Sequence, residues 1–381
     1  MKILQVIPFF SPKFGGSVTV LYELSKELAK RNHEVTIITS DFGFDSQYAK
    51  TIHDAGVEVI PFHCIANFGL FLYTPSIKKW LEKNLKKFDI IHLHNYRSYQ
   101  NVVIRSFAVK YGIPYIVQAH GSVLPFFKKQ NLKKLYDLVW GDKILENSSK
   151  LIALTDTESE QYQTMRVPKN KIKIIPNGLD FKEFENLPNR GEFRRKYQIT
   201  DDCKIILYIG RLHGTKGLDL LIDAFHKVIK EKINCKLVII GPDDGYLTQI
   251  QSKANYLGLQ NKIKIIGFIP NNEKIQALVD SNVFVTPSFS GFPVTFLEAC
   301  ACGLPIITST HGDNLDWIDN NVGFVVEYNP SRLKDAIFKI IDDEALSRKF
   351  SNQGKQLVAE QFNWNAICDQ IEMHYREVIY Q

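Results

Sequence analysis

The sequence predicts an α/β protein with two doubly wound, Rossmann-like domains, each a parallel sheet covered by helices on both faces. Its 381 residues exceed the size at which one hydrophobic core usually stops growing. Short β-branched segments alternate with amphipathic helical segments, which is typical of parallel sheets. These segments form two series, separated by the polar stretch 180–202, which contains Pro188 and Gly191 and has no strand pattern.

The elements of each series follow in order along the chain. The strands predicted in the first series are 2–7, 34–39, 57–62, 89–94, 114–119, 150–155 and 172–177. The strands predicted in the second series are 204–209, 236–241, 262–267, 283–287, 305–308 and 322–326. Helical spacing lies between most of them, as in 18–31 and 218–231. We expect a first domain over 1–185, a second over 200–363, and a last helix, 364–381, that crosses back to the first domain.

The composition, 45% hydrophobic and 23% charged, is that of an ordinary globular protein. No apolar run reaches the roughly 18 residues of a membrane span, and the opening MKILQVIPFF has no signal-peptide cleavage site. The six cysteines include no CxxC pair, which favours buried thiols in a reducing compartment over metal or redox use. We therefore expect a cytoplasmic protein without a metal.

Charge is distributed unevenly between the two halves of the chain. Residues 1–180 hold 24 Lys and Arg against 16 Asp and Glu, while the remainder holds 23 against 25. This asymmetry indicates an anionic partner that faces the first half.

Parallel α/β sheets bind ligands at the carboxyl ends of their strands, so the turns that follow the strands are the places to search. In the first such turn, Gly15 and Gly16 open a helix, where backbone N–H groups could approach an anion. A loop that only needs a positive φ explains these glycines equally well. The dinucleotide-binding pattern GxGxxG is missing, which disfavours a nicotinamide dehydrogenase.

A second turn combines two cations with glycines. Arg211 follows a strand, and Lys216 precedes a helix in a loop that contains Gly210, Gly214 and Gly217. Two cations at close range suit a diphosphate, although solvated surface cations are the alternative.

The third turn, PSFSGFPVTFLEACACG (287–303), leads into a helix that carries one carboxylate, Glu298. Gly291 and the backbone amides of Val294 and Thr295 could face a phosphate, and Glu298 could accept hydrogen bonds from two sugar hydroxyls. An acid near a helix N-terminus is also favourable for the helix dipole alone.

The fourth turn places His120 at the end of a strand, next to Gly121. A histidine there could donate to a sugar hydroxyl or to developing charge, but a structural histidine is the alternative. We interpret His92 and His94 as loop residues, because a metal pair there would lack nearby acids.

Together these motifs resemble the retaining glycosyltransferases of family four, which have the GT-B fold of two Rossmann-like domains facing across a cleft. The resemblance covers essentially the whole chain. Its parts are Gly15-Gly16, His120-Gly121, IPNGLD (175–180), GRLHGTKG (210–217), GFIPNNEKIQAL (267–278), the segment 287–307 and FNW (362–364).

The resemblance implies a role for each motif residue. Arg211 and Lys216 would hold the donor diphosphate, Glu298 would bind the ribose, and backbone near Phe268 would contact the base. Gly15 and Gly16 would approach the β-phosphate or the acceptor, and His120 would lie beside the transferred sugar. The family pattern E-x7-E has Ser290 in place of its first acid here, which changes the contact to the donor sugar.

The implied activity is transfer of a hexosyl unit from a UDP- or GDP-linked sugar, with retention and without a metal or other cofactor. The acceptor would be a glycan or a lipid-linked glycan, as in polysaccharide or glycolipid biosynthesis, and no nucleic acid is expected as a partner. Alternatives are a non-hydrolysing UDP-sugar epimerase and an inactive sugar-nucleotide-binding protein. Asp243 and Asp244 lie in a turn-like context and form no convincing metal motif.

Segment 124–145 combines lysines with apolar and aromatic residues and predicts a basic amphipathic helix. Such a helix could lie in an anionic membrane interface, and the basic run 78–87 adds to this. An ordinary solvated helix is the alternative.

Overall fold

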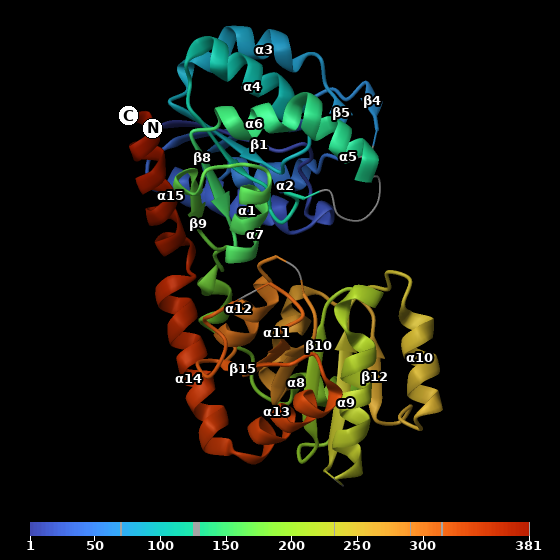
Figure 1. Cartoon of the computed structure of the whole chain (residues 1–381). Coiled ribbons are helices and arrows are strands. Elements are labelled where there is room, and N and C mark those ends of the chain that lie inside the picture. Colours follow the sequence, from blue (N-terminus) through green and yellow to red (C-terminus); the bar gives the residue numbers. More distant parts are fainter. Residues whose placement is uncertain (69–70, 125–129, 232, 290, 314, 381) are drawn as a thin grey trace. The chain divides into compact units, whose positions relative to one another are not determined.

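The computed structural model describes residues 1–68, 71–124, 130–231, 233–289, 291–313 and 315–380 (Figure 1). The chain forms two compact units: unit 1 comprises Met1–Gly178 and Trp364–Gln381, and unit 2 comprises Leu179–Asn363. The expected first domain reached residue 185, but residues 179–185 belong to unit 2. Leu179 forms a bridge with Asn363, and its N–H donates to the carbonyl of Phe362 at 2.7 Å, so the chain enters unit 2 earlier than the sequence pattern indicated.

Unit 1 is built on a seven-stranded parallel sheet with the strand order β3-β2-β1-β6-β7-β8-β9. The strands are β1 (Lys2–Val6), β2 (Glu34–Ser40), β3 (Val57–Phe62), β6 (Ile90–His94), β7 (Tyr115–Gln118), β8 (Lys150–Ala153) and β9 (Ile172–Ile174). Every strand of the first predicted series is present. The order turns back beside β1, so the carboxyl ends of β1 and β6 lie next to each other, where ligands of such sheets bind.

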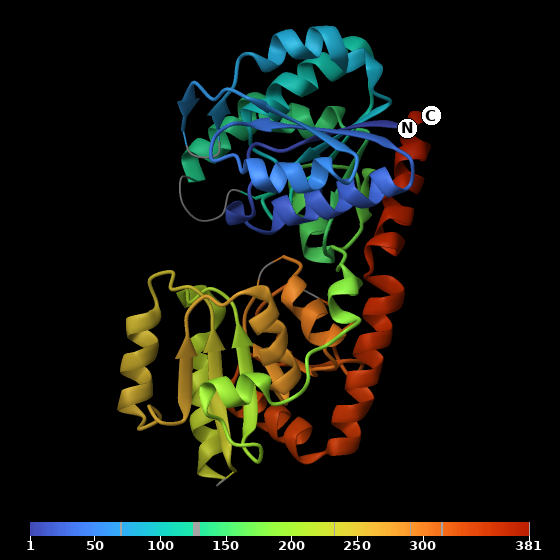
Figure 2. The same cartoon turned by 180° about the vertical axis from the view of Figure 1, so that it is seen from behind.

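Successive residues of these strands point to opposite faces, and both faces are covered by helices (Figure 2). Ile3 packs with helices α1 (Gly16–Lys30), α2 (Ser46–His53) and α15 (Trp364–Ile379). Its neighbour Leu4 packs on the other side with α3 (Ile77–Asn84), α4 (Tyr99–Tyr111), α6 (Asp142–Asn147) and α7 (Asp156–Thr164). Because both faces are buried, the strands are apolar nearly throughout, as the sequence pattern indicated.

The final helix α15 belongs to unit 1, which confirms the predicted return to the first domain. Its apolar side completes the core over β1 and β6. Two sets of polar contacts attach it further: Arg31 bonds to Asp369 at 2.8 Å, and the nearly buried Lys150 bonds to Glu377 at 2.6 Å.

Unit 2 is built on a six-stranded parallel sheet with the order β12-β11-β10-β13-β14-β15. Its strands are β10 (Lys204–Ile209), β11 (Cys235–Ile240), β12 (Ile263–Ile266), β13 (Val283–Thr286), β14 (Ile306–Ser309) and β15 (Gly323–Val326). One face packs against α9 (Leu218–Lys230), α10 (Leu247–Tyr256) and α13 (Pro330–Asp342). Phe284 on the other face contacts Phe296 of α12 (Val294–Ala301), beside α8 (Glu192–Tyr197) and α11 (Asn271–Asp280), and α14 (Glu344–Gln361) contacts α12.

Segment 130–147 of unit 1 is helical throughout but not uniform. It consists of α5 (Gln130–Tyr136), a π-helical turn, η3 (Asp137–Gly141), and α6. The two-stranded antiparallel hairpin of β4 (Ala66–Asn67) and β5 (Leu72–Tyr73) lies beside α5 in both views (Figures 1 and 2). Within the described ranges, no helix is both long and apolar enough to span a membrane.

Candidate active site

Two of the sequence motifs meet at the carboxyl ends of β10 and β13 in unit 2. These strands are neighbours in the sheet, so the loops that follow them lie side by side. Ser288 donates its hydroxyl to the carbonyl of Thr215 at 2.8 Å. Gly217, with φ +70°, lies so close to Pro287 that an added Cβ would be 3.0 Å from the Cβ of that proline. The glycine therefore allows the two loops to approach each other.

Lys216 is a partly buried cation at this junction, at the end of the short helix η6 (Gly214–Lys216). Burial, and to a lesser extent the neighbouring Arg211, lowers the pKa of Lys216. Among the described residues no carboxylate forms an ion pair with it. A bound anion would compensate both unfavourable effects.

Arg211 is exposed and pairs with Asp244, which follows β11. The adjacent Asp243 accepts the N–H groups of Tyr246 and Leu247, at 2.9 and 3.0 Å. Sequence analysis placed both acids in a turn-like context and missed the partnership of Asp244 with Arg211. The two residues are 33 positions apart, and only the adjacency of β10 and β11 brings them together.

Glu298 lies one turn into α12 and has a free acceptor. Its Oε1 accepts from Nζ of Lys274 in α11 at 2.6 Å, while its Oε2 is buried and has no hydrogen-bond partner among the described residues. A buried carboxylate oxygen without a partner is unfavourable, so this atom indicates a binding function. Lys274 was not among the predicted site residues, although it lies in the GFIPNNEKIQAL motif.

The beginning of α12 agrees with its sequence pattern in part. No side chain caps the helix at Pro293, which leaves the first amides, those of Val294 and Thr295, without that partner. Gly291 has φ +71°, and its N–H donates to Asp313 at 3.1 Å, so this amide already has an acceptor.

Two further predicted residues lie apart from these contacts. Ser290 falls outside the described residues. Phe268 follows β12 and is 80% exposed, so its ring contributes little to the core.

In unit 1, Gly15 lies between the short helix η1 (Pro12–Phe14) and α1, and Gly16 is the first residue of α1. Gly15 has φ +95°, and its N–H donates to Pro12, so the turn itself requires this glycine. A Cβ added at either glycine would meet no atom within 4 Å. The space beside both residues is therefore open.

His120 follows β7, at the carboxyl end of the unit 1 sheet. It has φ +54°, in the left-handed region that non-glycine residues seldom adopt. Its Nε2 lies 2.9 Å from Nδ1 of His94, and burial lowers the pKa of His120 to about 3. The next residue, Gly121, donates its N–H to the buried carboxylate of Glu158 at 2.6 Å. Glu158, another residue that sequence analysis missed, fixes the backbone beside His120.

The interpretation of His92 and His94 as loop residues is wrong. Both lie in β6, and both are fully buried. The pattern IIHLH places them on one face of the strand, which the sequence analysis did not use. Within the described residues, no three His, Cys, Asp or Glu side chains come together to form a metal site, and transfer without a metal stays a prediction.

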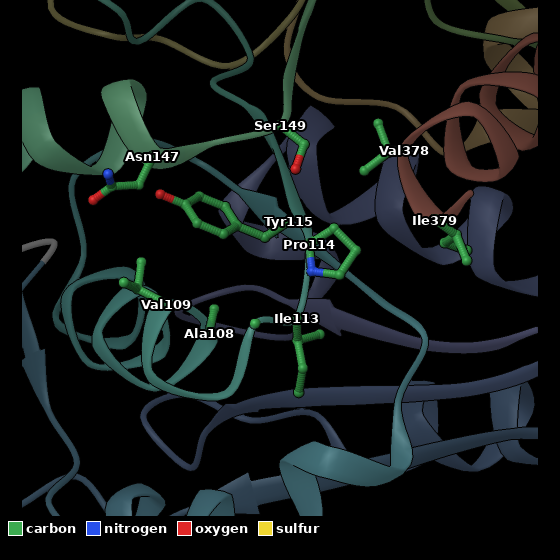
Figure 3. Close-up of a pocket in the computed structure, with 10 residues that line it drawn as sticks. Ala108, Val109, Ile113, Pro114, Tyr115, Asn147, Ser149, Val378 and Ile379 are labelled. Atoms are coloured by element: carbon green, nitrogen blue, oxygen red, sulfur yellow. The ribbon is translucent and has the colours of Figure 1, made fainter. Parts of the chain in front are cut away.

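A pocket of about 380 Å³ lies elsewhere in unit 1 (Figure 3). It is lined by residues of α4, by the loop before β7 and by Val378 and Ile379 of α15. Tyr115 donates its hydroxyl to the carbonyl of Ile144 at its wall. The pocket is at the amino end of β7, whereas ligands of parallel sheets bind at the carboxyl ends. It contains none of the predicted site residues.

Comparison with known proteins identifies the family and the fold of this chain. Residues 189–357 match the family model described as glycosyl transferases group 1, and residues 14–183 match the model of glycosyltransferase family 4. The chain is 24% identical to the N-acetyl-alpha-D-glucosaminyl L-malate synthase of Bacillus anthracis, covering 97% of this chain and 95% of the relative. It is 27% identical to the UDP-Gal:alpha-D-GlcNAc-diphosphoundecaprenol alpha-1,3-galactosyltransferase of Escherichia coli, covering 80% of this chain and 79% of the relative.

Among solved structures, Anabaena HepE in complex with UDP and glucose superposes with a TM-score of 0.78 at 17% identity, covering 99% of this chain and 100% of that chain. This similarity concerns the fold, which is GT-B, as the sequence motifs predicted. The two family models account for most of the chain, and all of the motifs that we singled out except FNW (362–364) lie within them. The chain therefore belongs to the group 1, family 4 glycosyltransferases and is a transferase enzyme of the GT-B fold.

Proposed function

We propose that this enzyme transfers a hexosyl unit, with retention of configuration, from a UDP- or GDP-linked sugar to a glycan or lipid-linked acceptor. The observation that carries the proposal is Lys216: a partly buried cation, beside a second cation and without an ion-pair partner among the described residues. Diphosphate is an anion that would balance Lys216 and Arg211 together. Metal-independent transfer is part of the proposal.

Glu298 supplies the second element of the donor site. Lys274 holds one carboxylate oxygen, and the other is buried without a partner. Two adjacent ribose hydroxyls would donate to that carboxylate, as the resemblance implies. The backbone near the exposed residue Phe268 is assigned to the base, and the uncapped start of α12 is assigned to phosphate.

The chemical contribution of these groups is electrostatic. When the bond between sugar and diphosphate breaks, negative charge grows on the diphosphate oxygens. Arg211, Lys216 and the amides of Val294 and Thr295 would stabilise that charge, because fixed dipoles and cations need little rearrangement during the reaction. We place His120, Gly15 and Gly16 on the sugar and acceptor side of the reaction.

Segment 130–147 supports contact with a membrane surface where a lipid-linked acceptor would lie. Its exposed apolar residues are Leu132, Leu135, Leu138, Val139 and Trp140, which we call the apolar surface. Lys133 and Lys134 lie on the same helix, and Trp140 stacks on Phe71 beside the hairpin. Apolar and basic residues together are typical of helices that bind anionic interfaces. Residues 125–129 of the predicted basic segment lie outside the described residues.

The donor site is tested by thermal shift with UDP, GDP and their sugar conjugates. A ligand that binds the folded state raises the melting temperature by mass action. We expect one base to be preferred, and the shift to vanish in the Arg211→Ala/Lys216→Ala variant. If no nucleotide raises the melting temperature of the wild type, the donor site is wrong.

A further inference from the structure

A chain of hydrogen bonds at the carboxyl end of the unit 1 sheet leads to His120, and its other members have no role in the proposed function. It begins at Tyr375 of α15, whose hydroxyl lies 3.3 Å from Nε2 of Gln5. Oε1 of Gln5 lies 2.7 Å from Nε2 of His94, and Nδ1 of His94 lies 2.9 Å from Nε2 of His120. We call these four residues the relay. His92 joins it sideways, with Nδ1 at 2.7 Å from the hydroxyl of Tyr375.

The relay residues come from distant parts of the sequence but from one face of the sheet. Gln5 pairs in register with His92, and both lie on the face that contains Ile3 and Ile90. That face is covered by α15, which brings Tyr375 over the strands. Gln5, His94 and Tyr375 are fully buried.

Burying four polar side chains side by side is unfavourable unless each finds a partner, and an apolar core would avoid the cost. Here the partners are the other relay residues, and the only relay member with partial exposure is His120. The arrangement therefore leads from the helix α15 to His120, the one relay residue that is not fully buried.

The relay also determines which ring nitrogens carry protons. Oε1 of Gln5 can only accept, so Nε2 of His94 carries the proton of that ring. A neutral imidazole has one N–H, so Nδ1 of His94 accepts, and Nε2 of His120 donates to it. The remaining nitrogen of His120, Nδ1, then has a free electron pair and no proton. Burial, which lowers the pKa values of His94 and His120, favours the neutral rings that this order requires.

We propose that Gln5, His94 and Tyr375 are positioning residues that hold His120 in the Nε2–H form, so that its Nδ1 accepts a hydrogen bond from a hydroxyl of the transferred sugar. The proposal rests on the proposed function for its ligand. It narrows the role of His120, since a ring in this form accepts from a neutral hydroxyl at Nδ1 and cannot donate there to a carboxylate or phosphate oxygen.

The tautomer is testable without any activity assay. In the full-length protein with ¹⁵N-labelled histidine, long-range ¹H–¹⁵N correlation spectra distinguish the two neutral forms. We expect His94 and His120 both in the Nε2–H form, with signals assigned by loss in His94→Gln and His120→Asn variants. A protonated Nδ1 on His120 in the wild type would overturn the proposal.

A pair of conservative variants tests positioning against mere stability. Tyr375→Phe and Tyr115→Phe each remove one hydroxyl from a nearly or fully buried tyrosine of unit 1, but only Tyr375 is in the relay. We expect a comparable fall in melting temperature for both. Only Tyr375→Phe should change the ring signals of His120 and lower kcat/KM, by about 10-fold on the scale of other groups that orient a functional histidine. Equal effects of the two variants on His120 and on kinetics would reduce the relay to a structural feature.

The contact between His120 and the sugar hydroxyl is tested with the labelled protein. UDP-glucose, UDP-galactose or GDP-mannose is added, and UDP or GDP is added separately. We expect the Nδ1 signal of His120 to move with a sugar nucleotide and not with the matching free diphosphate. If diphosphates bind but no sugar conjugate moves the signal, the sugar contact is wrong while the donor site stands. If no nucleotide binds at all, the proposed function fails, and the contact with it, whatever the tautomer.

Discussion

The carboxyl ends of the two sheets occupy the same place in the same kind of fold, yet they are built in opposite ways. In unit 1, neutral polar side chains are bonded to one another from Tyr375 to His120, and all but His120 are fully buried. In unit 2, the corresponding loops carry an exposed arginine, a lysine without an ion-pair partner among the described residues, and a carboxylate oxygen without a hydrogen bond.

This difference teaches what each end can do before a ligand arrives. The loops of unit 2 have unsatisfied charge, so they can gain most from binding an anion. At the end of unit 1, the four relay residues are already bonded to one another. They carry no net charge to compensate, but they hold one ring in a fixed orientation. We thus assign the strength of anion binding to unit 2 and the orientation of one histidine ring to unit 1.

The sharpest test of the comparison is acidification. Burial lowers the pKa of His92 to about 3, and that of His94 well below 6.5. Between the folded and unfolded pKa values the unfolded chain binds more protons, so stability is full above pH 6.5 and is lost as the pH falls towards 3. Each of these two histidines should lower the free energy of unfolding by about 1.4 kcal/mol per pH unit below 6.5. Hydrogen exchange at pH 6.5 and 5 should show unit 1 losing protection before unit 2.

His92→Gln serves as the control for this prediction, because it removes one titrating group. The free energy of unfolding of this variant should fall less steeply as the pH is lowered. The slope should correspond to roughly one proton fewer taken up on unfolding. Equal loss of protection in both units would contradict the assignment of neutral histidines to unit 1.

The next largest effect concerns the cations of unit 2. Arg211→Ala/Lys216→Ala should lower kcat/KM by about 1,000-fold or more, because both groups oppose charge that develops during transfer. Arg332→Ala is a matched control for the arginine, since Arg332 is 64% exposed and pairs with Glu327, while Arg211 is 62% exposed and pairs with Asp244. Should the control lose as much activity as the double variant, the site has been misplaced.

Glu298→Gln should have a smaller effect, confined to nucleotide affinity. Losing charge on a hydrogen-bonded acceptor costs about 1.5–3 kcal/mol, which corresponds to a rise of at least 10-fold in the Kd for UDP or GDP measured by calorimetry. Glu273→Gln breaks a comparable pair, with Lys196 at 2.7 Å, and should leave that Kd unchanged. An unchanged Kd in Glu298→Gln would remove this acid from the ribose site.

The smallest effect is expected on the apolar surface. Leu138 is 75% exposed, so Leu138→Glu should change stability by no more than about 0.5 kcal/mol. Its sedimentation with anionic liposomes at low salt should nevertheless fall several-fold. Tyr256→Glu, at a residue of unit 2 that is 89% exposed, should sediment like the wild type. A wild-type protein that does not sediment would exclude this surface as a membrane contact.

The sheets could be predicted from the sequence because their signal is local. β-branched runs such as KIILYI and KLVIIG mark strands by themselves, and Gly217 and Gly291 mark turns for the same reason. The basic amphipathic helix predicted over segment 124–145 is helical in its described part, from residue 130, but not uniform. Its π-helical turn ends at Gly141, where Tyr96 and Asp137 leave no room for a Cβ, and this contact involves a residue 45 positions away.

The candidate site could be predicted only as separate motifs. Local patterns do not contain the contacts between distant segments that complete the site. These contacts join Lys274 to Glu298, Asp244 to Arg211 and Tyr375 to Gln5. Alternation along IIHLH would have placed both histidines on one face, but only the packing of α15 shows what they meet.

Unit 1 is formed by segments that precede and follow unit 2 in the sequence, and this arrangement has a consequence for synthesis on the ribosome. Unit 2 is complete at Asn363, before α15 has been made. The sheet face over Ile3 and Ile90 must therefore wait, for roughly 10 to 40 s at ordinary translation rates, while the 185 residues from Leu179 to Asn363 are added. The domain that begins first is thus finished last, and a nascent chain that stops short of α15 leaves an apolar face available to chaperones or to aggregation.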